Sequence, residues 1–206
     1  MDRLLAQQDE RGAFAYPFDY RLYGHDFPAG WPSGMAQGFA LSVLRRAYDL
    51  SPDPRYIEAG DKAVEFLHLT REEGGVVTTL ADLHPSLDGY LWIEEFATLP
   101  ANYKLNGFMF TLFGLYDWST VPGPQAEFAG ELFESGIRTL KKTLRYFDVG
   151  GFTATDMRYM VVPGTRPNLS TLYHRVHIYQ LHSLSEITGD EVLKLYELLW
   201  RAYVGD

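Results

Sequence analysis

Two adjacent glutamates, Glu94 and Glu95, lie between the aromatic residues Trp92 and Phe96. Paired carboxylates in an aromatic surround suit acid–base chemistry, because burial and like charge raise the pKa of one of them toward neutrality. A solvated acidic turn would have the same local sequence, so both interpretations stay open. Further chemical groups follow in two later segments.

The first of these segments contains Asp156 and Arg158. The planar guanidinium of Arg158 could hold a carboxylate through two parallel hydrogen bonds. A structural ion pair between Arg158 and Asp156, or another acid, is an equally good interpretation of the sequence.

The second segment contains His174 and His177, which are three residues apart and so share one face near the start of a predicted helix. A metal could use this pair, but no third ligand is evident and we expect no metal site. Polar residues lining the mouth of an inner helix are the preferred interpretation. Trp31 stands at the entrance of another predicted helix, where it could contact a sugar ring or pack in a tight turn.

The composition narrows the class of protein. The chain has 206 residues, enough for one domain over residues 1–206, and a net charge of -9, which argues against a nucleic-acid partner. It has no cysteine, which excludes disulfides and fits a reducing compartment such as the cytoplasm, although many secreted bacterial enzymes also lack cysteine. No run of about 18 apolar residues is present, so we expect no membrane span. Residues 1–9 are polar from the start, so we expect no signal peptide.

Helical periodicity dominates the chain. Helices are expected at 34–48, 53–69, 106–118, 124–147, 173–187 and 190–203, and residues 1–8 resemble the end of a further helix. Apolar helices recur about every seventy residues, each followed by a more polar amphipathic helix. This pattern predicts an all-α fold, an incomplete α/α barrel (toroid) of stacked helical hairpins. The long connections 9–33, 71–101 and 150–172 are expected to build a site, with short β-hairpins at 78–83 and 151–162.

Several of these segments together resemble one family. They are Trp31 to Gly38, Glu94-Glu95, Leu105 to Met109, Leu115 to Asp117, Asp156 to Arg158, Pro167 to Leu169 and Tyr173 to Leu181. In this order and spacing they look like the C-terminal domain of D-glucuronyl C5-epimerases, which act on heparosan and heparan-sulfate precursors. The likeness covers nearly all of the chain.

The resemblance implies a function for most of these residues. In this family a base removes the C5 proton of a uronate and another group returns a proton to the opposite face, with no redox cofactor. Glu95 would be the base, and Tyr173 would serve the other face. The resemblance assigns the remaining side chains to the sugar acid and the polar wall around it: Arg158, Asn106, His174, His177, Gln180, Trp31 and Glu94. The partner would be an anionic oligo- or polysaccharide held by local cations such as Arg158, and the resemblance allows a homodimer.

Two positions depart from the family pattern. Phe96 and Thr155 stand where the family has tyrosines, so two phenols are missing. The tyrosines that could replace them are Tyr16, Tyr20, Tyr23, Tyr103 and Tyr159. Because of these departures three alternatives stay open: a non-catalytic uronate-binding module, a uronate polysaccharide lyase and a glycoside hydrolase.

Overall fold

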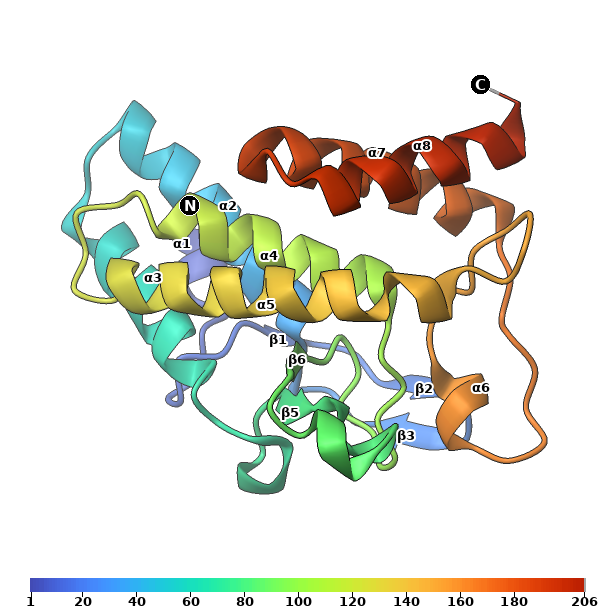
Figure 1. Cartoon of the computed structure of the whole chain (residues 1–206). Coiled ribbons are helices and arrows are strands. Elements are labelled where there is room, and N and C mark those ends of the chain that lie inside the picture. Colours follow the sequence, from blue (N-terminus) through green and yellow to red (C-terminus); the bar gives the residue numbers. More distant parts are fainter. Residues whose placement is uncertain (206) are drawn as a thin grey trace.

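Three helical hairpins carry most of the regular backbone in residues 1–205, the part of the chain that this computed structural model describes (Figure 1). The helices are α1 Asp2–Leu5, α2 Gly34–Leu50, α3 Pro54–Phe66, α4 Leu105–Trp118, α5 Ala126–Phe147, α6 Arg158–Val161, α7 Thr171–Thr188 and α8 Glu191–Val204. The hairpins pair α2 with α3, α4 with α5 and α7 with α8. The prediction of a mainly helical fold is therefore confirmed. No helix within residues 1–205 is long and apolar enough to cross a bilayer.

Local capping explains why these helices begin and end where they do. The Asp53 side chain accepts a hydrogen bond from the backbone N–H of Arg55, and Pro54 occupies the first helical position of α3. Helix α7 ends at Gly189, whose φ is +66°. Asp190 then caps α8 by accepting bonds from the N–H groups of the next turn. The expected helix starts near residues 53 and 190, and the break between 187 and 190, are confirmed.

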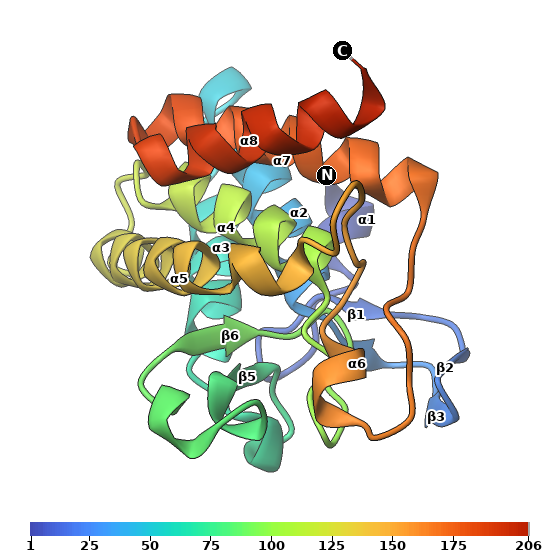
Figure 2. The same ribbon diagram turned by 45° about the vertical axis from the view of Figure 1, so that its right-hand side comes forward.

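Helix α4 is the central element of the packing, because it contacts α2, α5 and α7 (Figure 2). It lies against α2 with the two backbones touching. A Cβ on Gly38 would lie 2.5 Å from the carbonyl oxygen of Phe110, and one on Gly114 would lie 2.3 Å from the carbonyl oxygen of Gly38. Two glycines thus permit a closer approach than side chains would allow.

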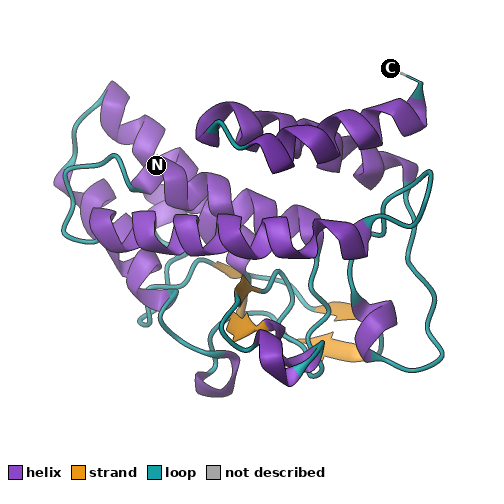
Figure 3. Ribbon diagram, viewed as in Figure 1, coloured by secondary structure: helices purple, strands orange, loops and turns teal. Residues whose placement is uncertain are grey.

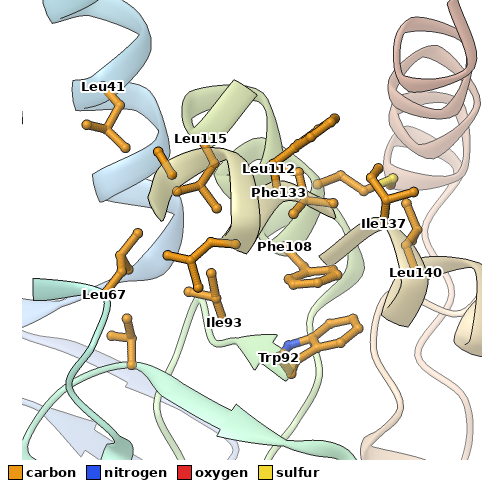
Figure 4. Close-up of a cluster of buried hydrophobic side chains, with 14 of the residues drawn as sticks. Leu41, Leu67, Trp92, Ile93, Phe108, Leu112, Leu115, Phe133, Ile137 and Leu140 are labelled. Carbon is orange, nitrogen blue, oxygen red and sulfur yellow. The ribbon is translucent and has the colours of Figure 1, made fainter. Parts of the chain in front are cut away.

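The hydrophobic core takes side chains from all three helical hairpins and from β6, and Figure 4 shows the part of it around Phe108 and Trp92. Trp92 stacks on Phe108 at 4.0 Å between ring centroids with an interplanar angle of 17°. Phe147, from the end of α5, stacks beyond them at 6.2 Å from Trp92. Since Trp92 immediately precedes Ile93 and Glu94, this packing anchors the segment that carries the paired carboxylates.

Six short strands lie with the long loops on one side of the helices (Figure 3). They form three antiparallel pairs: β1 Ala15–Tyr16 with β4 Trp31–Pro32, β2 Tyr20–Leu22 with β3 His25–Phe27, and β5 Val77–Thr79 with β6 Leu91–Ile93. Three 3₁₀ turns, η1 Arg71–Glu73, η2 Leu80–Asp82 and η3 Pro85–Leu87, complete the loop between α3 and β6. Short antiparallel strand pairs therefore occur in the long loops 9–33 and 71–101.

The predicted positions of two hairpins were wrong. Residues 78–83 do not fold back on themselves, because Leu80–Asp82 turns into η2 and β5 pairs with the later strand β6. Residues 151–162 form no hairpin, because their backbone bonds to distant segments. Ala154 pairs with Leu169, the carbonyl of Thr155 accepts from Leu105, and α6 follows.

Candidate active site

The carboxylates stand directly after β6, where backbone bonds hold the chain on both sides. The Glu94 N–H donates to the carbonyl of Val76, and the Glu94 carbonyl accepts from Gly34, both at 2.8 Å. The Glu94 carboxyl is fully buried. One oxygen accepts from the N–H of Tyr103 at 3.3 Å, and the other has no partner in the protein. Burial raises the pKa of Glu94 well above its usual value and so favours the neutral form of this carboxyl.

Glu95 lies against the first turn of α4. A Cβ on Gly107 would lie only 2.3 Å from its Oε2 atom, and this oxygen has no hydrogen-bond partner in the protein. The side chain is 6% exposed. Burial raises the pKa of Glu95 to about 7, while the positive charge of Lys104 opposes the rise. A carboxyl that is half ionised near neutral pH, with a free oxygen, is suited to accept a proton.

Asp156 is a further buried carboxylate, and its donors come from three parts of the chain. Its Oδ2 atom accepts from the hydroxyl of Tyr23 at 2.7 Å and from that of Thr155 at 3.0 Å, and lies 3.2 Å from the ammonium of Lys104. Burial lowers the pKa of Lys104, but Asp156 more than offsets this and the net shift is upward. Asp156 and Lys104 therefore form a buried ion pair at the N-terminus of α4.

Arg158 begins α6 with its guanidinium free of any ion pair in the described chain. Its backbone N–H donates to Asp156 Oδ1 at 3.2 Å, while the salt bridge of Asp156 goes to Lys104. The guanidinium carbon of Arg158 lies 4.8 Å from the ring centre of Tyr23. The five donors of this guanidinium are thus available to an anion beside the Tyr23 ring.

The two histidines are fully buried and joined by one hydroxyl. Thr153 Oγ1 lies 2.9 Å from the Nδ1 atoms of both His174 and His177. A hydroxyl has one proton, so it donates to one ring and accepts from the other, and the two rings hold opposite tautomers. Burial lowers the pKa of His177 to about 3, and also lowers that of His174. Both rings are therefore neutral, and one free Nε2 is a donor while the other is an acceptor.

Helix α7 reaches α4 through Gln180, whose amide donates to the backbone carbonyl of Asn106 at 2.9 Å. Several buried polar atoms of α7, of the first turn of α4 and of the segment between β6 and α4 have no hydrogen-bond partner in the protein. They are Glu94 Oε2, Glu95 Oε2, Asn102 Oδ1, Asn106 Oδ1, His174 Nε2, His177 Nε2 and Gln180 Oε1. An unpaired buried polar atom costs about 1–3 kcal/mol, so a group of them indicates a site built for a polar ligand.

Two predicted site residues stand apart from this group. Tyr173 lies in the first turn of α7, is 36% exposed and has its ring 6.5 Å from that of His177. Trp31 is 7% exposed and packs on Phe96 at 5.3 Å, while its indole N–H donates to the carbonyl of Phe18. Packing is the observed role of Trp31, and its contact with a sugar stays a prediction.

An apolar groove of about 500 Å³ lies elsewhere, between α2, α4 and α7. Phe39, Val43, Phe110 and Ile187 are among the residues that line it. None of the unpaired buried polar atoms within residues 1–205 belongs to a residue of this groove. Among the described residues, this groove therefore offers no unpaired buried polar atom to a ligand. Residues 1–205 hold no cluster of three His, Asp or Glu side chains suited to a metal ion.

Comparison with known proteins assigns the family. Residues 8–202 match the family described as "D-glucuronyl C5-epimerase C-terminus". The chain belongs to this family. It is 34% identical over 98% of its length to a D-glucuronyl C5-epimerase of Caenorhabditis elegans, of which it covers 34%. It is 28% identical over 97% of its length to an uncharacterised protein of Methanocaldococcus jannaschii, of which it covers 62%. The chain thus spans less than two thirds of either relative.

Phe96 and Thr155 stand at the two positions that depart from the C5-epimerase pattern, and neither side chain carries a phenol. Phe96 is buried between Tyr20, Phe27 and Trp31, with centroid distances of 5.3 to 5.6 Å. Thr155 is buried and uses its hydroxyl on Asp156. The side chains of Phe96 and Thr155 are thus both packed against other residues of the protein.

Sequence reasoning missed three groups in this epimerase-family site: Thr153, the Lys104–Asp156 ion pair and the position of Tyr23. The first two are ordinary residues whose partners lie 21 to 52 residues away, and no local pattern marks them. For Tyr23 there is a signal, because a bulky residue before Gly24 stands at the tip of the β2–β3 hairpin, where small turn residues are usual.

Proposed function

We propose that this chain is a carbohydrate isomerase-like enzyme that inverts C5 of glucuronate or iduronate units in a uronic-acid-containing glycan. The observation that carries the proposal is Glu95, a buried carboxyl with a pKa of about 7 and a free oxygen at the first turn of α4. The family membership supports the same chemistry. No redox cofactor is needed, because a proton leaves and a proton returns.

In this proposal the ionised Glu95 removes the C5 proton, which the neighbouring sugar carboxylate makes acidic. Arg158 pairs with that carboxylate and disperses the charge of the enolate that forms. Tyr173 is the phenol that the family resemblance assigns to the opposite face. Hydrogen bonds to sugar oxygens come from Asn106, Gln180, His174 and His177, with Glu94 and Trp31 supporting the wall. The opposite tautomers of the two histidines would let this wall both donate and accept.

We also propose that the chain works as one domain over residues 1–206, with its hairpins forming a section of an incomplete α/α barrel. One hydrophobic cluster includes residues from all three hairpins, which supports this arrangement. An anionic oligo- or polysaccharide is the proposed partner, and a homodimer the proposed assembly. The free guanidinium of Arg158 supports an anionic ligand despite the net charge of -9.

A second function, a non-catalytic uronate-binding module, is favoured by one observation. Phe96 and Thr155 remove two phenols of the family pattern, and both side chains are packed as stable parts of the fold. Such a module would keep the sugar-binding groups and lose the proton transfers.

The test is incubation of the chain with a glucuronate oligosaccharide of the heparosan type in deuterated water. We expect deuterium at C5 together with iduronate, and a loss of at least about 100-fold with Glu95→Gln, because a general base contributes on that scale. Exposed Glu131, on α5, gives the matched control Glu131→Gln. Unsaturated ends would indicate a lyase and new reducing ends a hydrolase. Binding without exchange, unchanged in Glu95→Gln, would establish the binding module instead.

A further inference from the structure

The Arg158 guanidinium has a carboxylate close by that it does not use. Asp156 stands two positions earlier, and its Oδ1 atom accepts from the Arg158 backbone N–H at 3.2 Å. An arginine so close to a buried carboxylate would ordinarily pair with it, because the guanidinium fork matches two carboxylate oxygens. Within residues 1–205, however, the ion pair of Asp156 is with Lys104. The guanidinium is therefore left for another anion.

The acceptor sites of Asp156 are already filled by other donors. An ionised carboxylate offers about four lone-pair sites. Oδ2 accepts from the hydroxyls of Tyr23 and Thr155 and lies 3.2 Å from the ammonium of Lys104, while Oδ1 accepts from the backbone of Arg158. Asp156 and Lys104 are both buried. With its charge matched and its acceptors occupied, Asp156 has little to offer the guanidinium.

The ring of Tyr23 supports the guanidinium from the β2–β3 hairpin, which lies beside α6 (Figures 1 and 2). The guanidinium carbon of Arg158 lies 4.8 Å from the ring centre. Stacking on a ring uses the flat face of a guanidinium and leaves the N–H groups at its edge free. The ring is itself fixed at its hydroxyl, which donates to Asp156 at 2.7 Å and accepts from the amide of Asn168 at 2.9 Å.

The backbone of Tyr23 is strained for this contact. Tyr23 and Gly24 connect β2 with β3, with φ values of +52° and +87°. Positive φ at both positions is the pattern of a type I′ turn, which favours Asn-Gly, Asp-Gly or Gly-Gly. A bulky residue in the left-handed region is strained, and such strain persists where the surroundings hold it for a function. The side chain of Tyr23 is thus the feature that this turn retains.

We propose that Lys104 and Tyr23 are positioning residues that keep the Arg158 guanidinium off Asp156 and available to a uronate carboxylate. This rests on the part of the proposed function in which Arg158 binds that carboxylate. Without Lys104, the buried Asp156 would have no cation and would draw Arg158 onto itself, because an unpaired buried charge is costly. In a chain with a net charge of -9, the loss of one free cation would remove much of the attraction for an anionic glycan.

The test compares binding of two probes, a glucuronate oligosaccharide of the heparosan type and the same oligosaccharide with its carboxyl groups reduced to alcohols. We expect the unaltered chain to prefer the first by about 10- to 100-fold, the scale of hydrogen bonds to a charged group, and Arg158→Met to lose this preference. In Lys104→Met the preference is expected to fall below about threefold. Combining Lys104→Met with Asp156→Asn is expected to restore it, because Arg158 then has no carboxylate to pair with.

Variants of Tyr23 test the proposal without breaking the buried ion pair. Tyr23→Leu removes the ring, and we expect the preference to fall by about 3- to 30-fold, the scale of a cation–π contact. Tyr23→Phe keeps the ring and is expected to retain most of the preference. Two controls remove similar contacts elsewhere and are expected to change nothing. Lys141→Met loses an ion pair with Asp190, and Tyr90→Leu loses a ring 5.5 Å from the ammonium of Lys142.

A double variant that prefers the uronate no more than Lys104→Met does would overturn the proposal, since Lys104 would then bind the sugar itself or hold the fold. An unchanged preference in Tyr23→Leu would overturn the role of Tyr23. So would an unaltered chain that does not distinguish the two probes overturn both roles, even if it exchanges the C5 proton. A chain that prefers the uronate through Arg158 but exchanges no C5 proton would contradict the epimerase, while the positioning of Arg158 would stand.

Discussion

The carboxylate side and the histidine side of the site are buried to a similar degree, yet burial affects them in opposite ways. Glu95 is 6% exposed, and burial raises its pKa to about 7. His177 is fully buried, and burial lowers its pKa to about 3. In both cases the low-dielectric interior disfavours the charged form. Burial thus brings the pKa of the acid Glu95 close to pH 7, and takes the pKa of the base His177 far from pH 7.

In the proposed function, this difference in pKa separates a group that transfers protons from groups that bind the sugar. A group that transfers protons must change its charge near the working pH, and Glu95 does so. His174 and His177 keep one neutral state, with their tautomers fixed by Thr153. They are suited to hold the hydroxyls of a sugar in a fixed pattern of donors and acceptors. A histidine in a catalytic-looking pair therefore need not be the acid or the base.

The largest effect on the carboxylate side is expected from Gly107→Ala. The new Cβ would lie 2.3 Å from Glu95 Oε2 and 2.6 Å from its Cβ, so the carboxyl must move. A displacement of about 1 Å at a reacting group costs about 100-fold in rate, and we expect a loss of C5 exchange on that scale. Gly130→Ala on α5 is the matched control, because its Cβ would meet Ser119 at 3.6 Å. Equal exchange rates in both variants would show that Glu95 needs no fixed position.

The second prediction concerns stability, since a raised pKa costs folding energy once the group ionises. The folded-state pKa of Glu95, about 7, lies above its ordinary value of 4.5. The folded chain therefore binds more protons than the unfolded chain between these values, and stability falls as pH rises from 4.5 through 7. Glu95→Gln removes this loss. We therefore expect the variant to gain stability relative to the unaltered chain as pH rises. Its free energy of unfolding, compared with that of the unaltered chain, should be about 2–3 kcal/mol higher at pH 8 than at pH 4.5.

Urea unfolding at the two pH values measures this difference. The exposed Glu131 on α5 again serves as control, and Glu131→Gln is expected to show the same relative stability at both pH values within about 0.5 kcal/mol. A Glu95→Gln variant whose relative stability is independent of pH would contradict the raised pKa.

The helices could be predicted from the sequence more completely than the carboxylate and histidine sides of the site. Helix α3 follows from Asp53 and Pro54, and the break between α7 and α8 from Gly189, because caps and periodicity are local. The Glu95 carboxyl is marked by its neighbours in the chain. A raised pKa for one of the two glutamates was also predicted, but the burial that causes it in Glu95 could not be, because burial comes from contacts such as that with Gly107, twelve positions later.

Contacts between residues far apart in the chain could not be predicted from the sequence. Residues 151–162 have the composition of a hairpin, yet their backbone bonds to residues outside the segment, among them Phe147, Leu105 and Leu169. Tyr23 meets Asp156 across 133 positions. Such contacts form only when the hairpins are packed, because the closure of a long loop must be stabilised by the core. Helices were thus predictable from local patterns, and the shared site was predictable only as a list of residue types.

The smallest effect on C5 exchange is expected on the histidine side, from Thr153→Val. Valine matches the shape of threonine but cannot bond to either ring, so both Nδ1 atoms of His174 and His177 lose their partner. Each buried polar atom without a partner costs about 1–3 kcal/mol, so for the two atoms we expect the unfolding free energy to fall by about 2–6 kcal/mol. The control is Thr143→Val, since Thr143 is equally buried but bonds only to carbonyls of its own helix. C5 exchange is expected to change less than about tenfold, because no titrating group is lost. If Thr153→Val is as stable as Thr143→Val, the bridge does not hold the rings, and their opposite tautomers have another origin.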